Sequence, residues 1–132
     1  MEKKPKLLDK KRLLISCNEN LINKIIEQAI RNISNLETIY EQDLTELLAR
    51  VFMSEPKLII IAKNDLDESL NFAKHIRNNP NFIDIPIICI SQPLEKDSKT
   101  IKKKIINLKL HFYTIPINNF ELTKVIKQFL EN

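Results

Sequence analysis

The chain has 132 residues, a hydrophobic fraction of 43%, a charged fraction of 29% and a formal net charge of +4. This composition is typical of one globular domain, and no apolar run reaches the roughly 20 residues of a membrane-spanning helix. The moderate charge argues against a dedicated nucleic-acid-binding domain. The sequence contains no glycine, which excludes a P-loop and a dinucleotide-binding fingerprint, because both need glycine where the backbone approaches phosphate.

Residues 1–11 are rich in lysine and have no apolar segment of the signal-peptide type. We therefore expect a basic, flexible lead-in, a single domain over residues 12–132 and a cytoplasmic location. In the absence of glycine, asparagine is expected wherever the backbone needs a positive φ angle. Cys17 and Cys89 lie in apolar contexts and are expected to be buried, reduced thiols.

Apolar runs predict five strands, at residues 12–17, 36–41, 56–62, 85–91 and 112–115. Apolar residues at helical spacing follow each of these runs, and the fourth of these helices is predicted over residues 96–110 with its lysines outward. Cap signals stand at residues 18–20, at Asp43, and at Asn118 with Glu121 three positions later. Strands that alternate with helices predict a parallel sheet with helices on both faces.

Two segments carry a resemblance to a known family. The sequences KHIRNNP at residues 74–80 and IPIICIS at residues 85–91 resemble the third helix and fourth strand of response-regulator receiver domains, which act in two-component signalling. Pro116-Ile117 with Glu121-Leu122 resembles the start of the last helix of that family. The resemblance implies a flavodoxin-like (βα)5 fold, an α/β doubly wound five-stranded parallel sheet with strand order 2-1-3-4-5.

Receiver domains accept a phosphoryl group on an aspartate that ends the third strand. An acidic pair after the first strand holds Mg²⁺, and a hydroxyl and a lysine at the ends of the fourth and fifth strands bind the phosphoryl oxygens. The resemblance places the nucleophile on Ala62 and the acidic pair on Cys17 and Asn18, with Glu19 following as in the family. It places the hydroxyl on Ser91 and the lysine on Ile115. An alternative register would place the nucleophile on Asp65 in the following loop.

These substitutions remove the family's chemistry. A methyl group cannot attack phosphorus, and a thiol with a carboxamide is a poor substitute for two carboxylates on Mg²⁺. Ile115 supplies no cation for a phosphoryl oxygen. We therefore interpret the chain as a non-phosphorylatable pseudo-receiver without catalysis, metal or cofactor, which works as a signalling or regulatory module through protein–protein interaction.

The resemblance also suggests where a protein partner or a second copy would bind. In receiver domains the fourth helix, fifth strand and fifth helix form the docking and dimerisation surface. The corresponding surface here carries Lys99, Lys102, Lys103, His111, Tyr113, Lys124 and Lys127. Phe112 falls where the family has an aromatic residue that changes rotamer on phosphorylation, and we expect it to be a core residue.

Two other functions stay open from the sequence. The basic lead-in and the lysines of the fourth helix could bind nucleic acid or another anionic surface. Cys17 precedes a predicted helix, whose dipole would lower the pKa of a thiol and support a cysteine enzyme. However, Asn23 stands where a cysteine phosphatase needs an arginine. His75 and His111 lack metal-ligand spacing and are expected to be surface residues.

Overall fold

The computed structural model describes residues 10–95 and 98–131, so most of the predicted lead-in lies outside the described residues. The elements, with η2 a short 3₁₀ helix, are β1 Lys11–Cys17, α1 Asn20–Ile30, β2 Leu36–Tyr40, α2 Leu44–Ser54, β3 Leu58–Ala62, α3 Leu66–Arg77, η2 Pro80–Phe82, β4 Ile87–Ser91, α4 Lys99–Asn107, β5 Leu110–Thr114 and α5 Asn119–Leu130. The strands form one parallel sheet in the order β2-β1-β3-β4-β5. The predicted fold class and strand order are confirmed.

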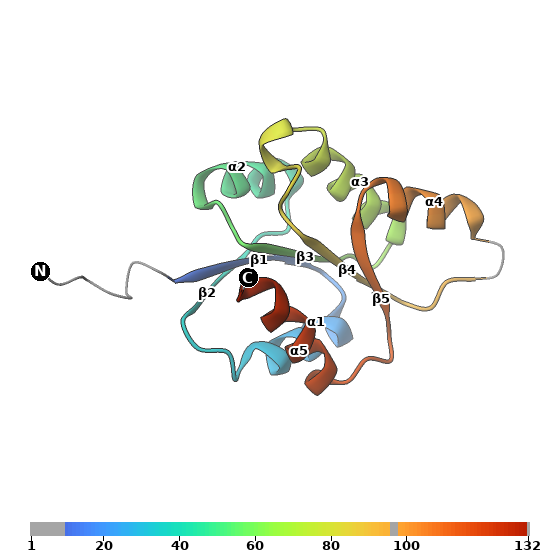
Figure 1. The fold of residues 1–132 in the computed structure, drawn as a ribbon. Coiled ribbons are helices and arrows are strands. Elements are labelled where there is room, and N and C mark those ends of the chain that lie inside the picture. The colour runs from blue at the N-terminus through green and yellow to red at the C-terminus, as the bar shows by residue number, and fades with distance from the viewer. Residues whose placement is uncertain (1–9, 96–97, 132) are drawn as a thin grey trace, which may run out of the picture.

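Two layers of helices cover the sheet. Helices α1 and α5 lie on one face, and α2, α3 and α4 lie on the other (Figure 1). Side chains of β3 alternate between the two resulting cores, because successive residues of a strand point to opposite faces. Ile60 belongs to the cluster under α1 and α5, whereas Ile59 and Ile61 belong to the cluster under the other helices. Every residue of β3 is buried, as a strand covered on both faces requires.

The helix caps follow the cap signals in the sequence. Asp43 accepts a hydrogen bond from the backbone N–H of Glu46 at 3.0 Å, and Asn118 accepts one from Glu121 at 2.7 Å. At α1 the capping side chain is Glu19, the middle residue of the predicted signal. Ser98 precedes α4 but makes no such side-chain bond. Among the helices for which a cap is described, α4 is therefore the one that begins with the weakest local support.

Several element boundaries differ from the sequence prediction. Strand β3 begins at Leu58, two residues after Pro56. Strand β4 begins at Ile87 rather than at Ile85, because the N–H of Ile85 donates to the carbonyl of Phe82 in the turn that follows η2. Helix α4 ends at Asn107, and Leu110 already belongs to β5, so the predicted helix was too long and the predicted fifth strand began too late. The cause is Lys109, whose left-handed backbone (φ 57°) terminates the helix.

The expectation that asparagine occupies the positions of positive φ was wrong for two residues out of three. In the described part of the chain these positions are Asn35, Glu55 and Lys109. Glu55 has φ 49° and ψ 62° and ends α2, where its N–H bonds to the carbonyl of Val51. A side chain with a Cβ atom is strained in this region, so α2 ends at a conformation that glycine would adopt more easily.

Replacing the strained residue should stabilise the protein. We predict that Glu55→Gly raises the free energy of unfolding by about 0.5 kcal/mol, because relief of about 1–2 kcal/mol of backbone strain outweighs about 0.4–1 kcal/mol of added unfolded-state entropy. Ala49→Gly, at an exposed position inside α2, is the matched control and should lower the free energy of unfolding by about 1 kcal/mol. Urea denaturation measures both, and an equal loss in the two variants would contradict strain at Glu55.

Candidate functional site at the carboxyl edge of the sheet

The sheet register brings together the positions that the sequence assigned to a phosphorylation site. Cys17 and Ala62 are paired across β1 and β3, and the N–H of Asn18 donates to the carbonyl of Ala62 at 3.2 Å. Ser91 ends β4, and the N–H of Ile115 donates to its carbonyl at 3.0 Å. All of these residues lie at the carboxyl edge of a parallel sheet, which is where α/β proteins of this topology place their sites.

The apolar members of this set belong to the core. Ala62 is fully buried, Cys17 is 4% exposed and Ile115 is 9% exposed, and all three contribute to the hydrophobic cluster beneath α1 and α5. Each therefore packs against neighbouring side chains at the edge of the sheet. Neither the methyl group of Ala62 nor the sec-butyl side chain of Ile115 offers a lone pair or a charge to a ligand.

The polar members bond to neighbouring loops. The side-chain oxygen of Asn18 accepts the N–H of Asn64 at 2.7 Å. One carboxylate oxygen of Glu19 caps α1, and the other accepts the side-chain amide of Gln92 at 3.0 Å. The hydroxyl of Ser91 donates to the carbonyl of Gln92 at 2.8 Å. These side chains hold the loops after β1, β3 and β4 to one another.

A buried lysine at this edge was missed in the sequence analysis. Lys63 directly follows β3 and is only 3% exposed. Its Nζ atom donates to the backbone carbonyl of Gln42 at 3.0 Å and to the side-chain oxygen of the same residue at 2.9 Å, and it lies 4.4 Å from the centre of the Phe72 ring. Burial lowers the pKa of Lys63, and nearby acidic groups offset part of this decrease.

Gln42 extends the contacts of this ammonium group to the first strand. Its side-chain amide donates to the carbonyl of Cys17 at 2.6 Å, while both of its oxygens accept from Lys63. One glutamine thus joins β1, the loop after β2 and the end of β3. The sequence signal was a lysine immediately after a fully apolar strand, a position where a charged side chain must either reach solvent or find internal partners.

The available donors do not fit Mg²⁺. This ion prefers charged oxygen ligands in an octahedral arrangement, and the two positions of the family's acidic pair hold a thiol and an amide whose oxygen is already bonded to Asn64. Within residues 10–95 and 98–131, no group of three His, Cys, Asp or Glu side chains is placed to hold a metal ion. The nearby Lys63 ammonium would in addition repel a cation.

The two thiols are poorly suited to nucleophilic chemistry. Burial raises the pKa of Cys17, and its Sγ atom donates to the carbonyl of Glu19 at 3.4 Å. Burial raises the pKa of Cys89 to about 12. Because the thiolate is the reactive form, a cysteine enzyme at Cys17 has no support from this geometry. Both residues are free and buried, as predicted.

The side chains assigned to the docking surface come from three elements at the β5 edge of the sheet. Lysines of α4 and α5 flank this strand, and all of those assigned are exposed: Lys99, Lys102, Lys103, Lys124 and Lys127. His111 is exposed, and its ring lies 4.6 Å from that of Phe129. Tyr113 is half-buried, and Phe112 packs against the core beneath α2, α3 and α4, as predicted for a core residue. His75 is also exposed, as predicted for a surface histidine.

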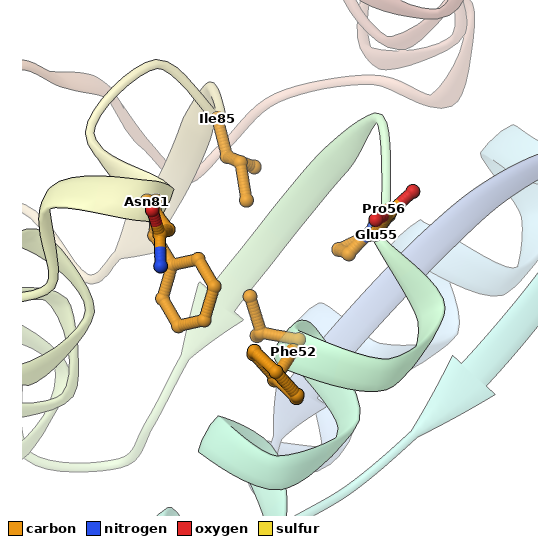
Figure 2. Close-up of a pocket in the computed structure, with 7 residues that line it drawn as sticks. Phe52, Glu55, Pro56, Asn81 and Ile85 are labelled. Atoms are coloured by element: carbon orange, nitrogen blue, oxygen red, sulfur yellow. The ribbon is translucent and has the colours of Figure 1, made fainter.

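A hollow of about 470 Å³ lies near the amino-terminal ends of β3 and β4, between the end of α2 and η2 (Figure 2). Its lining residues are Val51, Phe52, Glu55, Pro56, Asn81, Phe82 and Ile85. None of the residues assigned to a site from the sequence lies here. Glu55 is the one ionisable side chain of this lining, so the hollow has no pair of groups for acid–base or metal chemistry.

None of the described helices has the length and apolar character needed to cross a membrane.

The fold is shared with response-regulator structures. A chemotaxis protein, CheY4 of Vibrio cholerae, is 18% identical, with 92% of this chain and 99% of that chain covered and a TM-score of 0.73. A response regulator from Thermotoga maritima is 15% identical, with 93% and 99% covered and a TM-score of 0.72. The phosphorylated cyanobacterial phytochrome response regulator RcpA is 21% identical, with 93% and 95% covered and a TM-score of 0.66.

No protein-family model matches the chain, and no curated protein matches it in sequence. At these identities, the structural likeness establishes the receiver fold.

The buried ammonium group should affect how stability depends on pH. Because the pKa of Lys63 is lowered by burial from its ordinary value of 10.5, the unfolded chain holds this proton to a higher pH than the folded chain. Stability therefore rises with pH through the interval just below 10.5. We predict that Lys63→Met, which keeps the contact with Phe72, removes this rise.

Denaturation of wild type and Lys63→Met between pH 7 and 10.5 measures the difference. Lys24→Met, at an exposed position on α1, controls for the loss of one positive charge. If Lys63→Met retained the full slope of wild type, Lys63 would not be the source of the pH dependence.

Proposed function

We propose that this chain is a pseudo-receiver that is not phosphorylated and acts as a signalling or regulatory protein–protein interaction module. The observation that carries the proposal is the composition of the carboxyl edge. The phosphoryl-accepting position is the buried methyl group of Ala62, and the neighbouring polar side chains bond to one another's loops. A receiver fold whose edge lacks nucleophile, metal ligands and phosphate-binding lysine retains its surfaces as the means of function.

The alternative nucleophile has a structural role. Asp65 precedes α3, and its side chain accepts the N–H of Asp67 at 3.0 Å, so the carboxylate caps the helix. It follows Ala62 by three residues and lies outside β3. The position therefore supports capping better than phosphoryl transfer.

Phosphorylation can be tested directly. We predict that incubation with acetyl phosphate and Mg²⁺ produces no mass gain of a phosphoryl group, because the edge supplies neither a strand-end carboxylate nor a metal site. Intact-mass spectrometry measures the result, with a phosphorylatable receiver domain as the positive control. A stoichiometric gain in wild type would contradict the proposal, and its loss in Asp65→Asn would identify Asp65 as the nucleophile.

The surface most suited to a partner is the one formed by α4, β5 and α5. β5 is an edge strand, so one side of its backbone is unpaired within the sheet. Lysines flank this strand on both sides, and the half-buried Tyr113 lies between them. A protein partner with acidic side chains and an apolar centre would complement this arrangement.

Charge reversal should weaken docking on this surface. We predict that Lys102→Glu with Lys127→Glu reduces partner capture from extract of the native cell, or self-association measured by sedimentation, by about tenfold or more, since like charges across an interface cost several kcal/mol. Lys24→Glu with Arg31→Glu makes the same charge change at exposed positions of α1 and its cap. Equal losses in both variants would point to net charge alone and contradict docking at β5.

A second candidate is binding to nucleic acid or another anionic surface. The observation that favours it is the run of exposed lysines on α4, from Lys99 to Lys104. The lead-in that would assist binding lies mostly outside the described residues. A mobility shift with duplex DNA that weakens steeply with salt would support this function over protein docking.

A further inference from the structure

A groove of about 580 Å³ separates α3 from α4, on the same face of the sheet. It is lined by residues from both helices and from the turn that follows each of them: Asp67, Leu70, Asn71, Lys74, Asn78, Lys104, Asn107 and Leu108. None of these residues belongs to the carboxyl-edge positions or to the seven residues assigned to protein docking. Lys104 is shared with the lysine run of α4, and the other lining residues have no role assigned above.

The charged groups of the groove favour an anion. Lys74 on α3 and Lys104 on α4 both line it, and Asp67 is the one carboxylate among the lining residues. In the described part of the chain, neither ammonium group has a hydrogen bond or an ion pair with the protein. Two positive groups on the two walls can bind one anion between them, with less desolvation cost than a fully buried site.

Amide side chains add neutral donors to this pair. Asn71 and Asn78 come from α3 and its cap, and Asn107 ends α4. Each carboxamide can donate two hydrogen bonds. A phosphate group has several oxygens that accept bonds in different directions, so ammonium and amide groups on opposite walls can serve it together.

Two leucines give the groove an apolar part. Leu70 is 4% exposed and belongs to the core beneath α2, α3 and α4, and the half-buried Leu108 packs against the same core. Ligand sites commonly combine apolar surface with a few polar groups that fix orientation. The combination here fits a molecule with a phosphate and an apolar or aromatic body.

One end of the groove is held rigidly by Arg77. Its Nε atom donates to the carbonyl of Leu108 at 2.8 Å, and its Nη1 atom donates to the carbonyls of Phe82 and Ile85 at 3.0 and 2.8 Å. These bonds connect the end of α3 to the end of α4 and to the loop before β4. The spacing of the two walls is therefore set before a ligand arrives, which lowers the entropic cost of binding.

We propose that the groove between α3 and α4 binds a small organic phosphate. Lys74 and Lys104 contact the phosphate group, and Leu70 and Leu108 contact the apolar body of the ligand. The site takes no part in phosphoryl transfer and requires neither a metal ion nor a protein partner. Binding can therefore be measured on the isolated chain, and its presence or absence is independent of docking at β5.

The test is an NMR titration of the isotopically labelled full chain at low salt, with phenyl phosphate and adenosine monophosphate as probes. Phenol, adenosine and inorganic phosphate are added separately to test each part of the ligand alone. We expect saturable amide shifts confined to α3, α4 and the turns after them. Each complete probe should bind more tightly than inorganic phosphate or its own unphosphorylated body.

Matched variants assign the site. Lys74→Gln with Lys104→Gln should weaken binding by at least about tenfold, because the two substitutions together remove both charge-assisted hydrogen bonds to the phosphate group. Lys24→Gln with Arg31→Gln makes the same change of charge outside the groove, at exposed positions of α1 and its cap, and should leave affinity within about twofold. Thermal denaturation of each variant confirms that it is folded.

Three results would overturn the proposal. The first is the absence of saturable binding by both phosphate probes at low salt. The second is an equal loss of affinity in the two pairs of variants, which would indicate attraction to net charge alone. The third is binding of inorganic phosphate as tight as that of the organic phosphates, which would show that the leucines contribute nothing.

Discussion

Burial of the sheet on both faces is the constraint on which the rest of this structure depends. The side chains of β3 must satisfy two cores at once, and helices on each side are needed to cover them. This requirement fixes the alternation of strands and helices and places the loops after β1, β3 and β4 at one edge. The chemistry of that edge is then decided by a few residues at strand ends.

Those residues join the loops at the carboxyl edge of the sheet by direct contacts. Removing carboxylates and a metal from such an edge would leave loops that repel or lack partners, unless other contacts replace them. Here the amide of Asn18, the carboxylate of Glu19 and the ammonium of Lys63 supply direct bonds between the loops. The fold is thus compatible with this composition of the edge, because these side chains hold the loops together.

Periodicity and cap residues were enough to predict the order of the elements, since Asp43 and Asn118 act where the sequence places them. The resemblance supplied the strand order, and the register then grouped Cys17 with Ala62. Lys63 could not be predicted as buried, because its partner Gln42 is 21 residues away and the contact depends on tertiary packing. The left-handed residue Lys109 was also missed, because lysine carries no local signal for that conformation.

The ammonium group of Lys63 has one further consequence. A metal ion at the edge of a sheet exchanges with solution, so its occupancy follows ion concentration and can be removed by a chelator. Lys63 is covalently part of the chain, and its contacts with Gln42 and Phe72 form whenever the chain folds. Each folded molecule therefore carries this one ammonium group at the edge at neutral pH, whatever the concentration of metal ions in solution.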